Sequence, residues 1–115
     1  MDFDLFNTLQ QKSKELDTAV KQLRKSAYNY AKAYTDYRIA IAEETIKERD
    51  KKTPVTVTSD LVRGLPRVAK LKFEEILQEG IYKANQESIQ AIKLQIRLLD
   101  AQMQREYPIS GKGDI

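Results

Sequence analysis

The sequence predicts an all-α protein: a long antiparallel helical hairpin with a short extended or one-turn connector, which oligomerises into a helical bundle. The first observation is that apolar residues recur at spacings of three and four in both halves of the chain, as on one face of a helix. The second is that Pro54, Gly64 and Pro66 lie together near the middle. Proline excludes the preceding residue from a helix and is accepted in the first turn of a new one. We therefore expect a helix over about residues 4–51, a connector over about 52–65 and a helix over about 66–106.

The first helix carries a heptad-like stripe that continues through more than four heptads without proline or glycine. A helix of that length needs partners along its apolar side. Four of the six tyrosines of the chain fall within ten residues of this helix, at positions 28, 30, 34 and 37. The stripe, which includes three of them, consists of Leu9, Ser13, Leu16, Val20, Leu23, Ala27, Tyr30, Tyr34, Tyr37 and Ile41.

The connector is expected to be ordered but not helical throughout. Residues 55–58 are all β-branched, which favours an extended backbone. Thr58 or Ser59 could cap a single turn that Gly64 closes.

The second helix carries a similar stripe, and its C-terminal half is apolar on another side through Ile89, Leu94 and Leu98. One stripe can pack on the first helix while the other needs a further surface, so we expect a homodimer or homotetramer. Residues 1–107 should form a single helical domain, followed by a flexible tail at 108–115. The stripe consists of Phe73, Leu77, Ile81, Ala84, Ser88, Ile92, Ile96, Leu99 and Met103.

The residue inventory argues against catalysis. The 115 residues include no cysteine and no histidine, which removes thiol chemistry and the commonest acid–base and metal-binding side chain. No Gly-rich phosphate loop or nucleophile elbow is present. We therefore expect a protein that is not an enzyme and has no cofactor and no metal. No apolar run approaches the roughly 20 residues of a membrane span, and two of the first four residues are acidic where a signal peptide is basic. These features predict a soluble cytoplasmic protein with no membrane partner.

The net charge of +3 is unevenly distributed. Residues 1–50 carry nine Lys/Arg and nine Asp/Glu, whereas residues 51–72 carry six Lys/Arg and a single acid, Asp60. The connector and the start of the second helix should therefore form an electropositive end. Such an end could neutralise DNA phosphates, bind a compact anion, or only balance the acidic end of the first helix, and the sequence leaves these alternatives open.

Arginines and tyrosines are the candidate binding residues, because guanidinium groups bind phosphate through two hydrogen bonds and tyrosine rings stack on bases. They would converge if the connector folded back over the end of the hairpin. Arg105 lies near the far end of the second helix and could join them only across a subunit interface. Arg38 could equally pair with Asp36 or Glu43 on a solvated surface. The candidate ligand-binding residues are Tyr34, Tyr37, Arg38, Arg63, Arg67, Lys70 and Arg105.

Six segments of the chain are similar to a known family: 34–38, 40–48, 54–64, 68–72, 82–87 and 102–107. Through them, about residues 16–107 resemble small helical early-region proteins of temperate phages of Gram-positive bacteria. The family often ends in Arg-Glu-Trp where this chain has Arg105, Glu106 and Tyr107, a change that keeps an aromatic residue.

The resemblance implies a phage accessory protein in the cytoplasm of an infected bacterial host, in a group whose members usually have no assigned function. Small phage proteins of this size often inhibit host defence, for instance by sequestering nucleotide immune signals. We therefore expect a non-enzymatic protein that binds and sequesters a phosphorylated, cyclic nucleotide signal. The alternatives are a recombination or replication accessory protein that binds DNA or a DNA-processing protein through the basic end, and a direct protein inhibitor of a defence nuclease.

Overall fold

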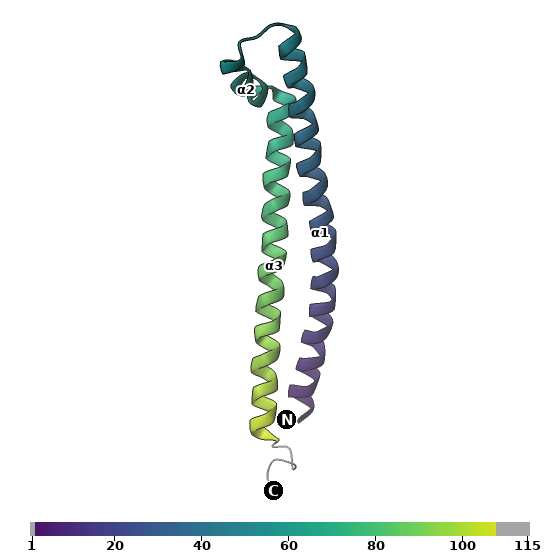
Figure 1. The fold of residues 1–115 in the computed structure, drawn as a ribbon. Helices are drawn as coiled ribbons and strands as arrows, with labels where there is room; N and C mark the ends of the chain where they lie inside the picture. The colour runs from purple at the N-terminus through teal and green to yellow at the C-terminus, as the bar shows by residue number, and fades with distance from the viewer. Residues whose placement is uncertain (1, 108–115) are drawn as a thin grey trace, which may run out of the picture. The chain divides into compact units, whose positions relative to one another are not determined.

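The computed structural model describes residues 2–107, which form three helices (Figure 1). They are α1 (Asp2–Asp50), α2 (Val55–Gly64) and α3 (Pro66–Glu106). The predicted all-α class is confirmed, and α1 and α3 begin and end within two residues of the expected positions. The predicted tail at 108–115 lies outside the described residues. None of the helices within 2–107 combines the length and the apolar character needed to cross a membrane.

The described residues pack as two compact units. One is Arg24–Lys83, which contains parts of all three helices, and the other comprises residues 2–23 and 84–107. Within each unit, the segments of α1 and α3 lie side by side and run antiparallel (Figure 1).

α1 ends in a Schellman turn, in which two backbone hydrogen bonds close the chain around a left-handed residue. The Lys52 amide donates to the Arg49 carbonyl (N···O 2.9 Å), and the Thr53 amide donates to the Glu48 carbonyl (3.1 Å). Lys52 takes the left-handed position with φ 61°, which costs a residue with a side chain roughly 1–2 kcal/mol. Thr53 is not helical, as the following proline predicts.

The prediction of an extended or one-turn connector is wrong, because ten of its residues form the helix α2. The Pro54 carbonyl accepts hydrogen bonds from the amides of Val57 (3.1 Å) and Thr58 (3.2 Å) and from the Thr58 hydroxyl (2.9 Å). The described residues give α2 no side-chain cap, so neither Thr58 nor Ser59 has the expected capping role. β-Branched residues disfavour a helix only weakly, whereas the burial of Val62, which is 1% exposed, favours it more.

α3 begins where the second proline predicts. Leu65 is extended (ψ 136°), as expected for a residue before proline, and its carbonyl accepts the first helical hydrogen bond, from the Ala69 amide (2.8 Å). The Leu65 amide itself donates to the Val62 carbonyl at the end of α2 (3.2 Å). Pro66 therefore occupies the first helical position, where its missing amide hydrogen leaves no bond unmade.

The core of the Arg24–Lys83 unit joins all three helices. Tyr37 and Ala40 of α1, Val62 of α2 and Val68 of α3 are buried together. Partly buried apolar side chains surround them, from Ile41, Leu65 and Leu71. Since α2 contributes Val62 to this cluster, α2 packs against α1 and α3.

The predicted stripe of α3 is wrong in this unit. Phe73, Leu77 and Ile81 are exposed, with 65%, 45% and 41% of their surface accessible. The buried side of the helix instead carries Val68 and Glu75. Glu75 tolerates burial because its carboxylate accepts a hydrogen bond from the Lys72 ammonium (3.0 Å). The predicted apolar residues and the buried residues both recur at helical spacing, on opposite sides of α3. α1 packs against the less apolar of these two sides.

On α1 the predicted stripe is confirmed only in part. Tyr37 is buried in the core, but Tyr34 is 48% exposed. Small residues, Ala33 and Ala40, take the central buried positions, which lets α3 approach closely.

In the other unit, Ile89 of α3 is buried, and the Asn85 amide group donates to the Gln22 carbonyl of α1 (3.4 Å). Leu94 and Leu98 remain exposed in the described chain. The three residues therefore do not share one side of α3 as predicted: Ile89 packs within the chain, whereas Leu94 and Leu98 lie about 140° and 180° around the helix from it.

Candidate functional site

A pocket of about 230 Å³ lies between the end of α1 and α2, inside the Arg24–Lys83 unit. α1 supplies Ile41, Thr45 and Arg49, which follow one another at intervals of four residues and so share one side of the helix. α2 supplies the opposite wall. The remaining lining residues are Thr53, Val55, Thr58, Ser59, Val62 and Arg63.

The pocket has an apolar base and two cationic walls. Ile41 and Val62 belong to the core cluster or pack against it, so this side of the pocket is fixed by the fold. Arg49 and Arg63 are exposed, one on each wall, and neither forms an ion pair with any described residue. Two guanidinium groups around a concave surface, without a carboxylate between them, create a positive potential that favours an anion.

The hydroxyl groups of the pocket divide into two pairs. The Thr53 hydroxyl donates to the Glu48 carboxylate (2.9 Å), and the Thr58 hydroxyl donates to the Pro54 carbonyl. Thr45 and Ser59 form no side-chain hydrogen bond among the described residues, so their hydroxyls can serve a ligand. The bond from Thr53, together with one from the Lys51 ammonium (3.2 Å), lowers the pKa of Glu48 below its usual 4.5. That carboxylate is thus engaged by Thr53 and Lys51 and forms no ion pair with Arg49.

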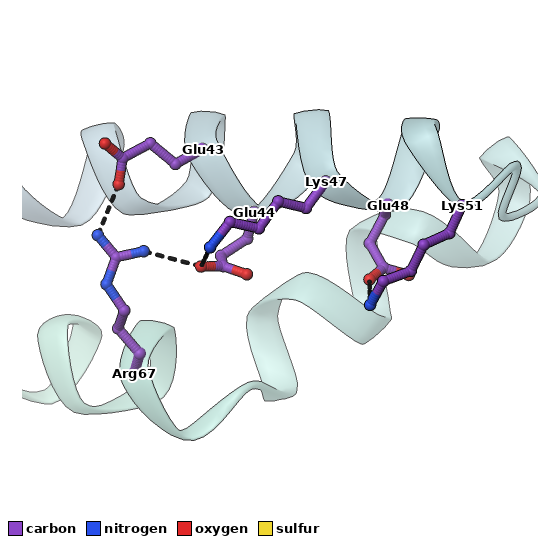
Figure 2. A network of polar contacts seen from close by, with 6 residues as sticks. All are labelled: Glu43, Glu44, Lys47, Glu48, Lys51 and Arg67. Carbon is purple, nitrogen blue, oxygen red and sulfur yellow. Dashed lines mark hydrogen bonds and ion pairs between the residues drawn. The ribbon is translucent and has the colours of Figure 1, made fainter.

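Arg67, a predicted ligand residue, is held by two carboxylates instead (Figure 2). Its guanidinium donates to Glu43 (2.6 Å) and to Glu44 (2.8 Å), and the Lys47 ammonium also lies 3.3 Å from Glu44. The hydrogen bonds from Lys47 and Arg67 lower the pKa of Glu44, and those to Glu43 and Glu44 raise the pKa of Arg67. For Arg67 the structure thus agrees with the alternative of a basic group that balances the acidic end of the first helix.

Tyr37, also a predicted ligand residue, belongs to the core. The residue is 8% exposed, and the Lys72 ammonium lies 4.8 Å from the ring centroid, within the range of a cation–π interaction. The ring therefore stabilises the contact between α1 and α3 in this chain and is not open for stacking.

Tyr34 lines a groove with two other tyrosines. The groove, about 350 Å³ in volume, is formed by Ala27, Tyr30, Ala31 and Tyr34 of α1 and Tyr82 of α3. The ring centroids of Tyr30 and Tyr82 are 5.9 Å apart, with the ring planes inclined by 34°. Burial, with a smaller effect of the Glu79 and Glu75 carboxylates, raises the pKa of Tyr30 above its usual 10.0, so its phenol remains a hydrogen-bond donor at neutral pH.

The three other predicted residues are exposed cations. Arg38 and Lys70 belong to the Arg24–Lys83 unit, and Arg105 belongs to the other one. None of the three forms an ion pair with a described residue, and the partners suggested for Arg38 are engaged elsewhere, Asp36 with Lys32 and Glu43 with Arg67. In the structure, Arg63 thus lines the pocket and Tyr34 lines the groove, whereas Arg67 and Tyr37 form other contacts.

Arg49 was not among the residues predicted from the sequence. Its position four residues after Thr45 and eight after Ile41 does indicate a shared face of α1. A shared face of α1 indicates a binding site only where another element lies opposite it. That element is α2, which was not predicted as a helix. Within residues 2–107, acidic side chains do not gather in a group of three or more that could hold a metal ion.

Comparisons of the chain with protein-family models, with curated proteins and with solved structures find no match.

Proposed function

We propose that this protein is a non-enzymatic binding protein that sequesters a phosphorylated nucleotide, with a phosphate group held between Arg49 and Arg63. The observation that supports this proposal is the pocket itself. It combines two arginines without carboxylate partners in the described chain, two hydroxyls that are not engaged there and an apolar base fixed by the core.

The chemistry of these groups suits a phosphate group. A guanidinium group presents paired N–H donors that match two phosphate oxygens, and hydrogen bonds between charged groups are about twice as strong as neutral ones. The hydroxyls of Thr45 and Ser59 can donate to the remaining oxygens. A bound dianion would also relieve the repulsion between Arg49 and Arg63, which adds to the driving force.

Sequestration, in preference to turnover, is supported by the inventory of the sequence. The chain has neither histidine nor cysteine, and the pocket is lined by no carboxylate or lysine that could act as a general base. The resemblance to early-region phage proteins gives such a binder a role, the removal of a nucleotide signal of host defence. This role is a proposal based on that resemblance.

The DNA-binding alternative receives less support from the geometry. Of the six cations at 51–72, Lys51, Arg67 and Lys72 each lie within 3.3 Å of a carboxylate of the same chain. Half of the charge that would meet a DNA backbone is thus balanced internally, which favours a compact ligand at Arg63 over an extended polyanion.

Self-association is also part of the proposal. Phe73, Ile76, Leu77 and Ile81 are large apolar side chains of α3 that are each at least 41% exposed, and they occupy one side of the helix. Contiguous apolar surface of this kind is typical of an interface, and the helical stripe fits the corresponding stripe of a second copy. We propose that α3 of one chain packs against α3 of another through these residues.

The test of the binding site is isothermal titration calorimetry with cyclic di-AMP and with inorganic pyrophosphate. Arg63→Ala and Arg49→Ala should each weaken binding of both compounds roughly 10- to 100-fold, because each removes a charge-assisted hydrogen-bonded contact. Arg97→Ala, an exposed arginine of α3 in the other unit, is the matched control and should bind as the unaltered protein does. Circular dichroism must show that the variants keep their helix content. Undiminished binding by Arg63→Ala would contradict the proposed site.

Native mass spectrometry of protein purified from cells with an active nucleotide-signalling defence tests the sequestering role. We expect an added mass of intact nucleotide that is absent after purification from cells without the defence system. Recovery of a cleaved nucleotide would contradict the proposal that the protein is not an enzyme.

A further inference from the structure

The exposed apolar surface of α3 extends beyond the residues proposed above for self-association. Exposed residues recur along this one helix, Pro66–Glu106, at alternating spacings of four and three, and each is exposed within the compact unit to which it belongs. That alternation is typical of a coiled-coil seam, because a left-handed supercoil takes up the drift of about 20° per heptad. The set, named the outer stripe, consists of Phe73, Leu77, Gly80, Ala84, Glu87, Ala91, Leu94, Leu98, Ala101 and Arg105.

Gly80 has no steric reason within a single chain. A Cβ atom built on it would meet no other atom within 4 Å. Glycine lowers the stability of a helix relative to alanine, and a missing side chain is useful where another group approaches the backbone closely. With Ala84 and Ala91, Gly80 therefore leaves room on the outer stripe for large side chains of another helix.

Two charged residues of the outer stripe select the direction of a second α3 helix. If two such helices paired in parallel and in register, Glu87 would face Glu87 of the second copy, and Arg105 would face Arg105. Like charges across an interface are strongly unfavourable. An antiparallel pair centred on residue 89 of each chain separates both. Glu87 then faces Ala91, and the Arg105 guanidinium faces the Phe73 ring, with which it can form a cation–π interaction.

The same antiparallel register sets large side chains against small ones. Such alternation fills the space between two helices without voids or clashes. Each contact occurs twice, because the two chains are related by a two-fold axis. The facing pairs are Leu77 with Ala101, Gly80 with Leu98, and Ala84 with Leu94.

Other antiparallel registers fit less well. A shift by one heptad sets Phe73 against Leu98 of the second copy, which places two large side chains together. It also sets Gly80 against Ala91, which leaves a void where both are small. A shift in the other direction sets the Glu87 carboxylate against Leu98, where it would be desolvated without a partner.

The residues beside the outer stripe are compatible with this pairing. Ile76 and Ile81, both exposed in the described chain, flank the stripe and extend the apolar contact. Lys83 and Arg97 of the second copy have the same charge on one flank. Both are exposed, and the Lys83 ammonium already lies 3.0 Å from the Glu79 carboxylate, so their repulsion is screened.

We propose that two copies of this chain pair through their outer stripes as an antiparallel coiled coil, with Gly80 of each copy beneath Leu98 of the other. This inference rests on the self-association that forms part of the proposed function. It adds the direction and the register of the partner helix.

Disulfide cross-linking tests the register, and the absence of cysteine from the chain makes each introduced thiol unique. Ala84→Cys and Leu94→Cys are prepared separately, mixed and oxidised mildly. In the proposed pair these two positions face each other, whereas two copies of residue 84 are separated by a rise of about 15 Å, beyond the roughly 7 Å between Cα atoms that a disulfide spans. We expect roughly 5- to 10-fold more cross-linked dimer from the mixture than from either protein alone. Gln86→Cys, exposed but off the stripe, is the matched control and should cross-link with neither.

Gly80→Leu tests the close approach at the outer stripe. The added side chain occupies the space assigned to Leu98 of the second copy and should raise the dissociation constant of the dimer about 10- to 100-fold. Gln86→Leu adds a leucine away from the stripe and should leave the constant unchanged. Sedimentation equilibrium measures both variants. Leucine is a better helix former than glycine, so circular dichroism should show that Gly80→Leu keeps its helix content.

The outcomes separate this inference from the self-association on which it rests. Cross-linking of Ala84→Cys with itself, without a cross-link in the mixture, would show a parallel pair and overturn the proposal. If light scattering finds a dimer but no mixture cross-links, the register is wrong while self-association stands. An unaltered chain that measures 13.3 kDa contradicts both. None of these results affects the nucleotide pocket, whose lining residues all lie between Ile41 and Arg63.

Discussion

Replacing Val62 by alanine tests whether α2 is held in place by burial, as the structure indicates. Val62 is 1% exposed and packs with Tyr37, Ala40 and Val68. The substitution removes two methyl groups, each worth about 0.8 kcal/mol of transfer free energy, and it leaves a cavity that raises the cost to about 2–3 kcal/mol. Alanine is the better helix former and returns up to about 0.7 kcal/mol. We therefore expect the free energy of unfolding to fall by about 1.5–2.5 kcal/mol.

Val55→Ala is the matched control, because Val55 lies in the same helix but is 88% exposed. Because Val55 is the first residue of α2, its gain in helix propensity is smaller than in the helix interior, and the substitution loses almost no burial, so stability should change by less than about 0.5 kcal/mol. Urea unfolding followed by far-UV circular dichroism measures both variants, and an unchanged slope with denaturant shows that the comparison is valid. If the two variants agree within about 0.5 kcal/mol, α2 is not anchored by Val62 and the pocket wall that it carries is misplaced.

Two further predictions concern pH and self-association. Because the hydrogen bond from Thr53 lowers the pKa of Glu48, the ionised form stabilises the fold above the usual 4.5, and this contribution is lost as the pH falls through the lowered pKa. Glu48→Gln should thus unfold more easily than the unaltered protein near neutral pH, and the difference in urea midpoint should disappear in acid; a constant difference would contradict the assignment. Leu77→Lys places a charge on the exposed stripe of α3 and should reduce the molar mass in light scattering to the 13.3 kDa of one chain, whereas Val55→Lys should not. An unaltered protein that already measures 13.3 kDa would rule out the proposed interface.

The helix ends could be predicted from the sequence because proline acts locally. Pro54 determines where α1 must stop and Pro66 where α3 can start, whatever the rest of the chain does. α2 could not be predicted in this way, since its β-branched residues favour an extended backbone and its stability comes from burying Val62 against residues of α1 and α3.

The face of α3 that packs against α1 could not be predicted either, for a similar reason. The apolar residues at 73, 77 and 81 form the stronger pattern, but the buried face contains Glu75, a charged residue of a type that is rarely buried. The hydrogen bond from Lys72, three residues earlier in the same helix, offsets the cost of burying it. The candidate site depended on the same unpredicted contacts. Arg63 was expected to bind an anion, but its counterpart Arg49 could be recognised only once α2 faced the end of α1.

The pocket is unusually local in the chain, since all of its lining residues fall between Ile41 and Arg63. Closing so short a loop costs little entropy, and contacts of low sequence separation are typical of rapid folding. We therefore expect the two arginine walls to come together early, once the Schellman turn at Lys52 has formed and Val62 has packed against Tyr37, Ala40 and Val68, before the distant halves of α1 and α3 meet. A site encoded by one short segment can also tolerate sequence change in the parts of α1 and α3 outside it, because those parts contribute no lining residue.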